Sequence, residues 1–214
     1  MATAFRRKGD RLVAKLDRLE REVVSVLMVQ TRDLLAPADT AARAPETDGD
    51  AFDELVATLD LEDMPGDELG PVSDAGTAAG TAPTRTESRD PALDRLLPSA
   101  NREDPEAAAE FRRLTEHGLR QRKSENLTIA IGALAAVRKD RLELDQRQAA
   151  AFVVSLVDVR LLLGDRLGLL TDEDADALHR YVDDAGPDDP RASLGAYYDF
   201  LTWLQESLTQ ALMR

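Results

Sequence analysis

Residues 153–168 read VVSLVDVRLLLGDRLG, and this run predicts a helix with an apolar side. At 100° per residue, one side of such a helix gathers the apolar residues Val153, Leu156, Val157, Leu163 and Leu167. Arg160 lies in the middle of that apolar side, and Gly164 follows one turn later. The opposite side, which we expect to face solvent, carries Ser155, Asp158, Asp165 and Arg166. The run therefore predicts a helix that turns a guanidinium toward the core.

Arg160 is expected to have a carboxylate partner, because a lone buried charge is costly. On this interpretation it forms a structural ion pair that docks two helices, and Gly164 clears room for it. The candidate acids on later segments are Asp183, Asp184 and Asp199. The alternative is an anion site, since a guanidinium on a rigid helix can hold a phosphate or carboxylate through two hydrogen bonds. The abundance of acids favours the ion pair.

The other charges of this run also have two interpretations. Asp158 and Asp165 lie seven residues apart on one helical face, a spacing that occurs in catalytic carboxylate pairs. Arg166 and solvent offer these acids simpler partners. We therefore predict structural ion pairing for these residues and no enzymatic site.

Composition predicts a soluble globular protein and excludes several kinds of chemistry. Of the 214 residues, 43% are hydrophobic and 32% are charged, and no apolar run approaches the ~18 residues that span a bilayer. The basic start lacks the apolar segment of a secretory signal, so a cytoplasmic location is expected. There is no cysteine, and neither His117 nor His179 has metal-ligand spacing around it. We expect no cofactor and no metal.

The net charge of −14 argues against broad attraction to nucleic acid, but the charge is unevenly distributed. Residues 44–74 carry eleven acids and no basic residue. Residues 1–32 carry eight basic residues against four acids, and residues 112–147 carry nine against five. DNA binding through the basic segments is therefore a weakened hypothesis that is not excluded.

The predicted fold is mainly α, a helical bundle with a short N-terminal β-hairpin and a disordered acidic insert. The hairpin pairs residues 5–7 with residues 11–16 around a Lys8-Gly9-Asp10 turn. Asp17 is placed to cap a helix that Pro37 ends, with Leu19 in its apolar stripe.

The remaining chain predicts further helices within one domain that spans residues 1–214. A short helix is expected over 51–61, followed by a Gly-, Pro- and Thr-rich linker over 62–90. One or two helical turns are expected within 90–98, closed by Pro98. Capping signals predict helices that start after Asp104, Asp145 and Thr171, and a final amphipathic helix is expected from about 193 to 213. A break is expected near His117-Gly118 in the helix that starts after Asp104.

Two surface features are candidates for partner contact. Trp203, the only tryptophan, lies away from the leucine stripe of the last helix, so it either anchors a partner or is covered by a second helix. A basic stretch that could touch phosphates or an acidic protein comprises Arg112, Arg113, Arg120, Arg122 and Lys123. These five do not share one helical face, so a solvated helix is the simpler interpretation.

Three long stretches stand out beside the opening FRRKGDRLVAKL of residues 5–16: DPALDRLLPSANREDPEAAAEFRRLTEHGLRQRK (90–123), DVRLLLGDRLGL (158–169) and YYDFLTWLQESL (197–208). Together they resemble an actinobacterial family of domains of unknown function. Members of that family are described as AosR-type oxidative-stress transcriptional regulators, and their genes commonly lie near that of the ClpS adaptor. The resemblance implies a regulator and brings no catalytic residues. Oxidation sensing of that type uses cysteines, which this chain lacks, so the shared role would be another one, such as binding a transcription-machinery partner.

The expected function is therefore that of a non-enzymatic regulatory protein of the oxidative-stress response, acting through contact with the transcription machinery. Two alternatives remain. One is direct DNA binding through residues 6–21 and 112–123, and the other is an adaptor linked to Clp proteolysis. The oligomeric state is not predicted.

Overall fold

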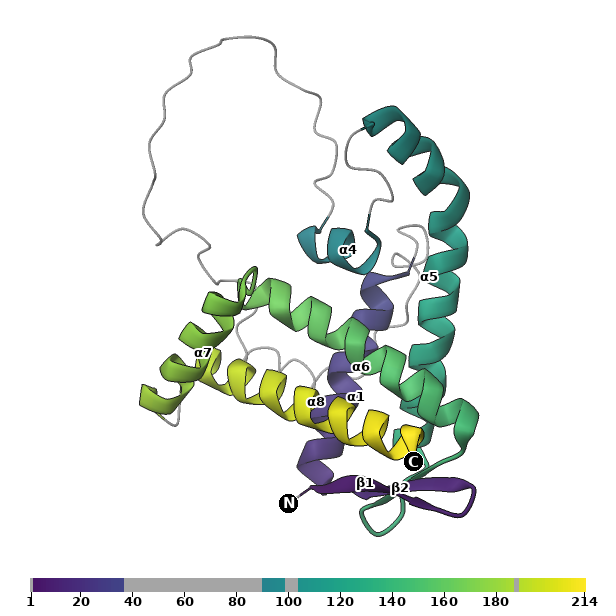
Figure 1. Cartoon of the computed structure of the whole chain (residues 1–214), viewed down its shortest axis with the longest axis vertical. Coiled ribbons are helices and arrows are strands. Elements are labelled where there is room, and N and C mark those ends of the chain that lie inside the picture. Colours follow the sequence, from purple (N-terminus) through teal and green to yellow (C-terminus); the bar gives the residue numbers. More distant parts are fainter. Residues whose placement is uncertain (1, 37–89, 99–103, 187–188) are drawn as a thin grey trace, which may run out of the picture.

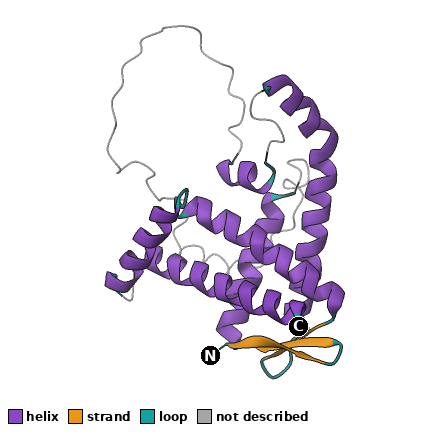
Figure 2. Ribbon diagram, in the orientation of Figure 1, coloured by secondary structure: helices purple, strands orange, loops and turns teal. Residues whose placement is uncertain are grey.

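The computed structural model describes residues 2–36, 90–98, 104–186 and 189–214. This part of the chain is mainly helical, with one three-stranded antiparallel sheet at one end (Figures 1 and 2). The elements are β1 (Thr3–Lys8), β2 (Arg11–Lys15), α1 (Arg18–Leu34), α4 (Pro91–Leu96), α5 (Pro105–Ala135), β3 (Arg141–Leu144), α6 (Gln146–Arg166), α7 (Asp172–Asp184) and α8 (Pro190–Met213). The predicted helix over 51–61 and nearly all of the predicted 62–90 linker lie outside the described residues.

The predicted hairpin is present and gains a third strand that the sequence analysis missed. β1 pairs with β2 around Gly9, whose φ of 60° is in the left-handed region that favours glycine. β2 pairs in turn with β3, with Lys15 opposite Arg141 and Val13 opposite Glu143. β3 has only four residues, and the alternation in RLEL is too short to separate it from a loop by sequence pattern. It completes a sheet whose inner face buries Leu12, Ala14, Leu142 and Leu144.

β1 also contacts the last helix of the chain. The backbone N–H of Phe5 donates to Ser207 Oγ on α8 at 3.4 Å. The Arg7 guanidinium donates to the carbonyl oxygens of Ala211 at 3.4 Å and Leu212 at 3.3 Å, near the C-terminal end of α8. Because cations favour helix C-termini, this contact joins the first strand to the last helix.

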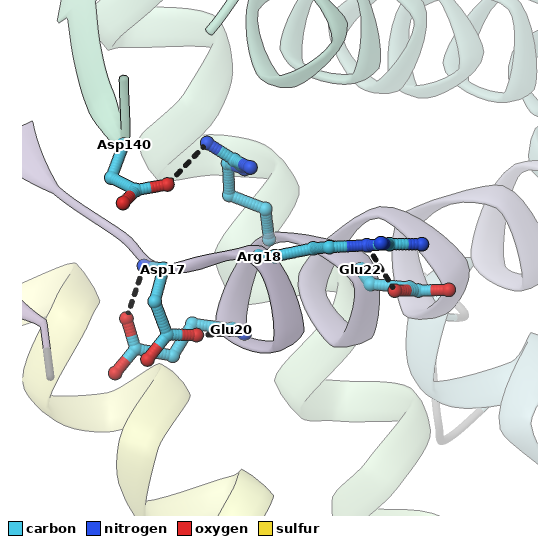
Figure 3. A network of polar contacts seen from close by, with 6 residues as sticks. Asp17, Arg18, Glu20, Glu22 and Asp140 are labelled. Atoms are coloured by element: carbon cyan, nitrogen blue, oxygen red, sulfur yellow. Dashed lines mark hydrogen bonds and ion pairs between the residues drawn. The ribbon is translucent and has the colours of Figure 1, made fainter. Parts of the chain in front are cut away.

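α1 begins with the capping box that Asp17 predicts. Glu20 N–H donates to Asp17 Oδ1 at 3.0 Å, and Asp17 N–H donates to Glu20 Oε2 at 2.7 Å (Figure 3). The Glu20 backbone N–H also holds the pKa of Asp17 below its usual value. Asp140, in the turn before β3, receives a hydrogen bond from Arg21 Nη1 at 3.1 Å, which ties α1 to the sheet (Figure 3). Leu19, predicted in the apolar stripe of this helix, is instead exposed.

α6 crosses the centre of the molecule between α5 and α8 (Figure 1). Leu156 and Leu163 are buried as predicted. The prediction that Ser155 and Asp158 face solvent is wrong, because α5 covers the side of α6 that carries them. Val157, predicted to face the core, is exposed. A helix packed on two sides keeps only narrow exposed strips, so its polar side need not be its outer side.

Two predictions about the long helix α5 have different outcomes. Asp104 caps it as expected, with its side chain accepting hydrogen bonds from the N–H groups of Glu106 and Ala107, both at 3.0 Å. The predicted break near His117-Gly118 is wrong, because α5 runs without interruption from Pro105 to Ala135. Neighbouring good helix formers outweigh the local cost of one glycine.

A single apolar cluster draws on every described helix and strand. It includes Phe5 of β1, Leu27 of α1, Leu96 of α4 and Phe152 of α6, whose ring meets that of Phe5 edge-on with centroids 6.3 Å apart. The N-terminal hairpin and α1 therefore share one core with the helices that follow residue 90.

α7 packs against α8 at a point where no side chain fits on the α8 backbone. A Cβ added at Gly195 would lie 2.6 Å from Val182 Cγ2 and 3.1 Å from Leu178 Cδ1. Leu178 is the buried residue of α7, so this contact seats the helix on the core. A Cβ added at Gly132 in α5 would have no atom within 4 Å of it, so Gly132 provides a matched comparison.

Gly195→Ala is expected to lower the free energy of unfolding by about 1–3 kcal/mol, because the added methyl group overpacks the contact with Val182. Gly132→Ala, also within a helix, is expected to raise it by about 0.5–1 kcal/mol, since alanine has the higher helix propensity. Urea denaturation of the two variants measures both changes. Equal effects of the two substitutions would show that α7 does not approach α8 this closely.

Candidate interaction surface on helix α5

The N-terminal half of α5 extends beyond the packed body of the molecule (Figure 1). In the C-terminal half, Leu127, Ala130, Ala133 and Leu134 are buried against neighbouring elements. In the half before residue 119, the described side chains include one buried residue, Ala108. Phe111 is 49% exposed and Leu114 is 67% exposed. Large apolar side chains on an uncovered helical face are typical of interaction surfaces.

The exposed apolar residues follow coiled-coil spacing. Ala107, Phe111, Leu114 and Gly118 are all exposed and are separated by four, three and four residues. This alternation places the four on one seam along the helix. We call this set the α5 seam. It is suited to receive a helix or an apolar peptide segment from another molecule.

A groove lies on the side of α5 that faces away from this seam, between α5, the end of α1 and α4. It has a volume of about 620 Å³. Apolar side chains of Leu34 and Leu93 form one part of its lining. The α5 side is polar and basic, and it contributes Arg112, Arg113, Glu116, His117 and Arg120. The groove therefore combines an apolar floor with a cationic wall, which favours an acidic partner with apolar anchors.

The predicted basic stretch is divided between this wall and structural contacts. Arg120 donates to Glu116 at 2.8 Å and to the Leu35 carbonyl at 3.1 Å, so it closes the C-terminal end of α1. Arg113 binds Glu110 through two hydrogen bonds of 2.9 and 2.8 Å, which lower the pKa of Glu110 and raise that of Arg113. Arg112 faces the groove, and its buried Nε has no acceptor among the described residues.

The last two members of the stretch do not line the groove. Arg122 is exposed on α5, away from the groove. Lys123 turns inward and forms an ion pair with Asp158 of α6. The structure thus brings three of the five predicted cations together and assigns Lys123 to the core.

Asp158 is the most deeply buried charge of the described residues, with 1% of its surface exposed. Its Oδ1 pairs with Lys123 Nζ, and its Oδ2 has no hydrogen-bond partner among the described residues. Burial raises the pKa of Asp158, and Lys123 acts in the opposite direction. The expected pairing with Arg166 is wrong, because α5 supplies the cation from a different helix.

The other two charges on this side of α6 hold α4. Asp165 pairs with Arg95 Nε at 3.0 Å, and Arg166 pairs with Asp90 at 2.6 Å. Arg95 also donates to the Leu169 carbonyl at 3.0 Å. Asp158 and Asp165 therefore bind separate cations on separate helices, an arrangement that gives no carboxylate pair for acid–base chemistry.

Arg160 joins α6 to α8. The prediction that its partner is a carboxylate is wrong. Its Nη1 donates to Gln205 Oε1 at 3.0 Å, and its Nη2 donates to the Tyr198 hydroxyl at 3.2 Å. Its guanidinium lies 5.1 Å from the centroid of the Tyr198 ring. None of the ion pairs among the described residues includes Arg160. Asp199, one of the expected acids, pairs with His179 instead, at 3.0 Å. A half-buried guanidinium keeps some hydration, so an amide, a phenol and an aromatic face suffice.

Trp203 is partly exposed on α8, and its ring stacks on that of Phe200 with centroids 6.0 Å apart. The intramolecular stack explains part of its burial, so it is a weaker anchor candidate than the α5 seam. The cations of α5 were predicted from the sequence, whereas Phe111 and Leu114 were not. The four-three-four spacing of small and apolar residues in a charged segment was the signal that could have identified them.

Lys123→Met is expected to lower the free energy of unfolding by about 3 kcal/mol at pH 7, because it leaves Asp158 buried without a cation. The pKa of folded Asp158 is already raised by burial, and losing Lys123 raises it further. In this variant the stability therefore recovers as the pH falls through that raised pKa, since the proton neutralises the carboxylate. Denaturation at several pH values measures the effect.

Arg122→Met, which removes an exposed cation from the adjacent position, is the control and is expected to change stability little. The double variant Lys123→Met/Asp158→Leu removes both charges and is expected to restore most of the stability. A loss in Lys123→Met that stays constant with pH would contradict the role given to the buried carboxylate.

Two features are absent from the described residues. None of their helices combines the length and apolarity that crossing a bilayer requires. Among them no group of three His, Asp or Glu side chains gathers as around a metal ion. No curated protein and no solved structure matches this chain significantly. A family model of a domain of unknown function, DUF2017, matches residues 2–212. The chain therefore belongs to the DUF2017 family.

Proposed function

We propose that this protein is a non-enzymatic regulator that acts by binding another protein through the N-terminal half of α5. The observation that carries the proposal is the exposed α5 seam, where Phe111 and Leu114 are 49% and 67% exposed. Apolar side chains of this size, when buried by a partner, supply most of the binding energy of typical interfaces. The charged residues of α6 have structural partners, which supports a non-catalytic role.

The groove on the opposite side of α5 indicates the chemistry of the partner. Arg112, Arg113 and His117 line it on the α5 side, and Leu34 and Leu93 line it on the other. A partner that contacts both sides of the exposed end of α5, with apolar residues against the seam and acidic residues against the groove, would complement both. Such a partner would bury Phe111 and Leu114 on one side of α5 and meet the cations on the other.

The resemblance noted from the sequence gives this partner a more specific identity. We propose that it belongs to the transcription machinery and that the contact regulates genes of the oxidative-stress response. Because the chain has no cysteine, the oxidative signal would enter through the partner or through another component, and not through a thiol of this chain.

The double variant Phe111→Ser/Leu114→Ser is expected to weaken binding to the RNA polymerase holoenzyme of the host by at least tenfold, because it removes both apolar anchors. Binding is measured by biolayer interferometry with the immobilised full-length chain. The fold is expected to remain intact, since both side chains are already exposed.

The matched control is Leu19→Ser/Leu170→Ser, which removes two leucines that are 63% and 78% exposed on other elements. This control is expected to bind as the unchanged chain does. If the unchanged chain fails to bind the holoenzyme, the transcription-machinery proposal is wrong. If both double variants bind equally well, the α5 seam is not the contact.

A further inference from the structure

The outer face of the three-stranded sheet carries cations from the N-terminal hairpin (β1 and β2) and from β3. Strand pairing places Lys8 opposite Arg11, Thr3 opposite Lys15, and Lys15 opposite Arg141. Paired residues project to the same side of a sheet, and the leucines of β2 and β3 occupy the inner side. The cations of the outer face are Arg6, Lys8, Arg11, Lys15 and Arg141. Glu143 is the acid that shares this face with them.

Several of these cations have no carboxylate partner. Arg141 pairs with Glu143, and Arg11 pairs with Asp145 at 3.7 Å. Arg6, Lys8 and Lys15 are exposed, and no ion pair involves them among the described residues. The three lie around a hollow of about 290 Å³ to which Thr3 and Arg141 also contribute. The surface is therefore a concave basic site with uncompensated charge.

This local charge contrasts with the acidity of the whole chain. Residues 37–89 carry thirteen acids against three basic residues, so they account for most of the net charge of −14. Screening limits the reach of a surface charge to about 8 Å at physiological ionic strength. Among the described residues, the charges that a ligand at the sheet experiences are therefore mainly the cations around the hollow.

We propose that this face of the sheet binds the phosphate backbone of duplex DNA. Large apolar anchors are missing from the outer positions of the described strands, where the apolar residues that line the hollow are Ala4, Ala14 and the half-buried Val13. Protein interfaces are typically centred on large apolar anchors, and amphipathic membrane contacts use them too, whereas nucleic-acid interfaces are polar and strongly positive. The face also lacks aromatic side chains on which bases could stack. We therefore expect the protein to contact DNA through its phosphates and to bind with little preference for base sequence.

The sheet and the α5 seam lie toward opposite ends of the molecule (Figure 1). A duplex on the sheet would therefore leave Phe111 and Leu114 free. The DNA site is independent of the proposed protein contact, and one molecule has room for both partners.

Fluorescence anisotropy of a labelled 25-base-pair duplex of arbitrary sequence tests the proposal with the full-length chain. If about four cations meet phosphates, the dissociation constant is expected to rise about 50-fold between 50 and 150 mM salt. The variant Arg6→Gln/Lys8→Gln/Lys15→Gln is expected to weaken binding at 50 mM salt by at least tenfold and to reduce the salt dependence to that of about one contact. Thermal denaturation checks that this variant stays folded.

The control Arg122→Gln/Arg180→Gln/Arg191→Gln removes the same number of positive charges from exposed positions on α5, α7 and α8. It is expected to bind the duplex as the unchanged chain does, and so is Phe111→Ser/Leu114→Ser, which separates this proposal from that for α5. If both triple variants weaken duplex binding equally, the effect comes from the net charge of the protein, and the proposed site is wrong. Absence of duplex binding at 50 mM salt would overturn it too. So would stronger binding to poly-glutamate or to vesicles of anionic phospholipid, since the site would then serve an acidic protein or a membrane.

Discussion

The structure depends on the enclosure of α6, which is covered by α5 on one side and by α8 on the other. A helix enclosed in this way has little free surface for the charged residues of its sequence. Its polar side chains must therefore find partners on the covering helices, since a buried charge without one is costly. The Lys123–Asp158 pair meets this requirement at the most deeply buried position.

Four charged residues of α6 contact three neighbouring helices, so the contacts specify the arrangement of the bundle. Asp158 forms an ion pair with α5, Asp165 and Arg166 form ion pairs with residues that belong to α4 or cap it, and Arg160 donates a hydrogen bond to α8. Apolar packing alone tolerates sliding and rotation of helices, because it is non-directional. Charge pairs and hydrogen bonds at defined positions favour one register. This distribution also leaves Asp158 and Asp165 on separate cations.

Local signals in the sequence predicted most helices and strands. Features that depend on contacts between distant parts of the chain were missed. The caps at Asp17, Asp104, Asp145 and Thr171 correctly marked helix starts, because capping depends on residues within one turn. The third strand, the burial of Asp158 and the partner of Arg160 depend on elements distant in the chain, which periodicity does not identify. At the candidate surface, the sequence indicated the cations of α5. The exposure of Phe111 and Leu114 became visible only once the neighbouring helices were placed.

The contact of β1 with α8 bears on how the chain acquires its structure during translation. Phe5 and Ser207 are 202 residues apart, so at elongation rates of about 5–20 residues per second the hairpin leaves the ribosome about 10–40 s before the helix that completes its packing. During that interval the apolar side of the hairpin, including the Phe5 ring, lacks part of its native cover. The nascent chain therefore stays incompletely packed until α8 has been synthesised. During this time its hydrophobic segment is open to chaperones, and cooperative folding of the whole domain must wait for the final helix.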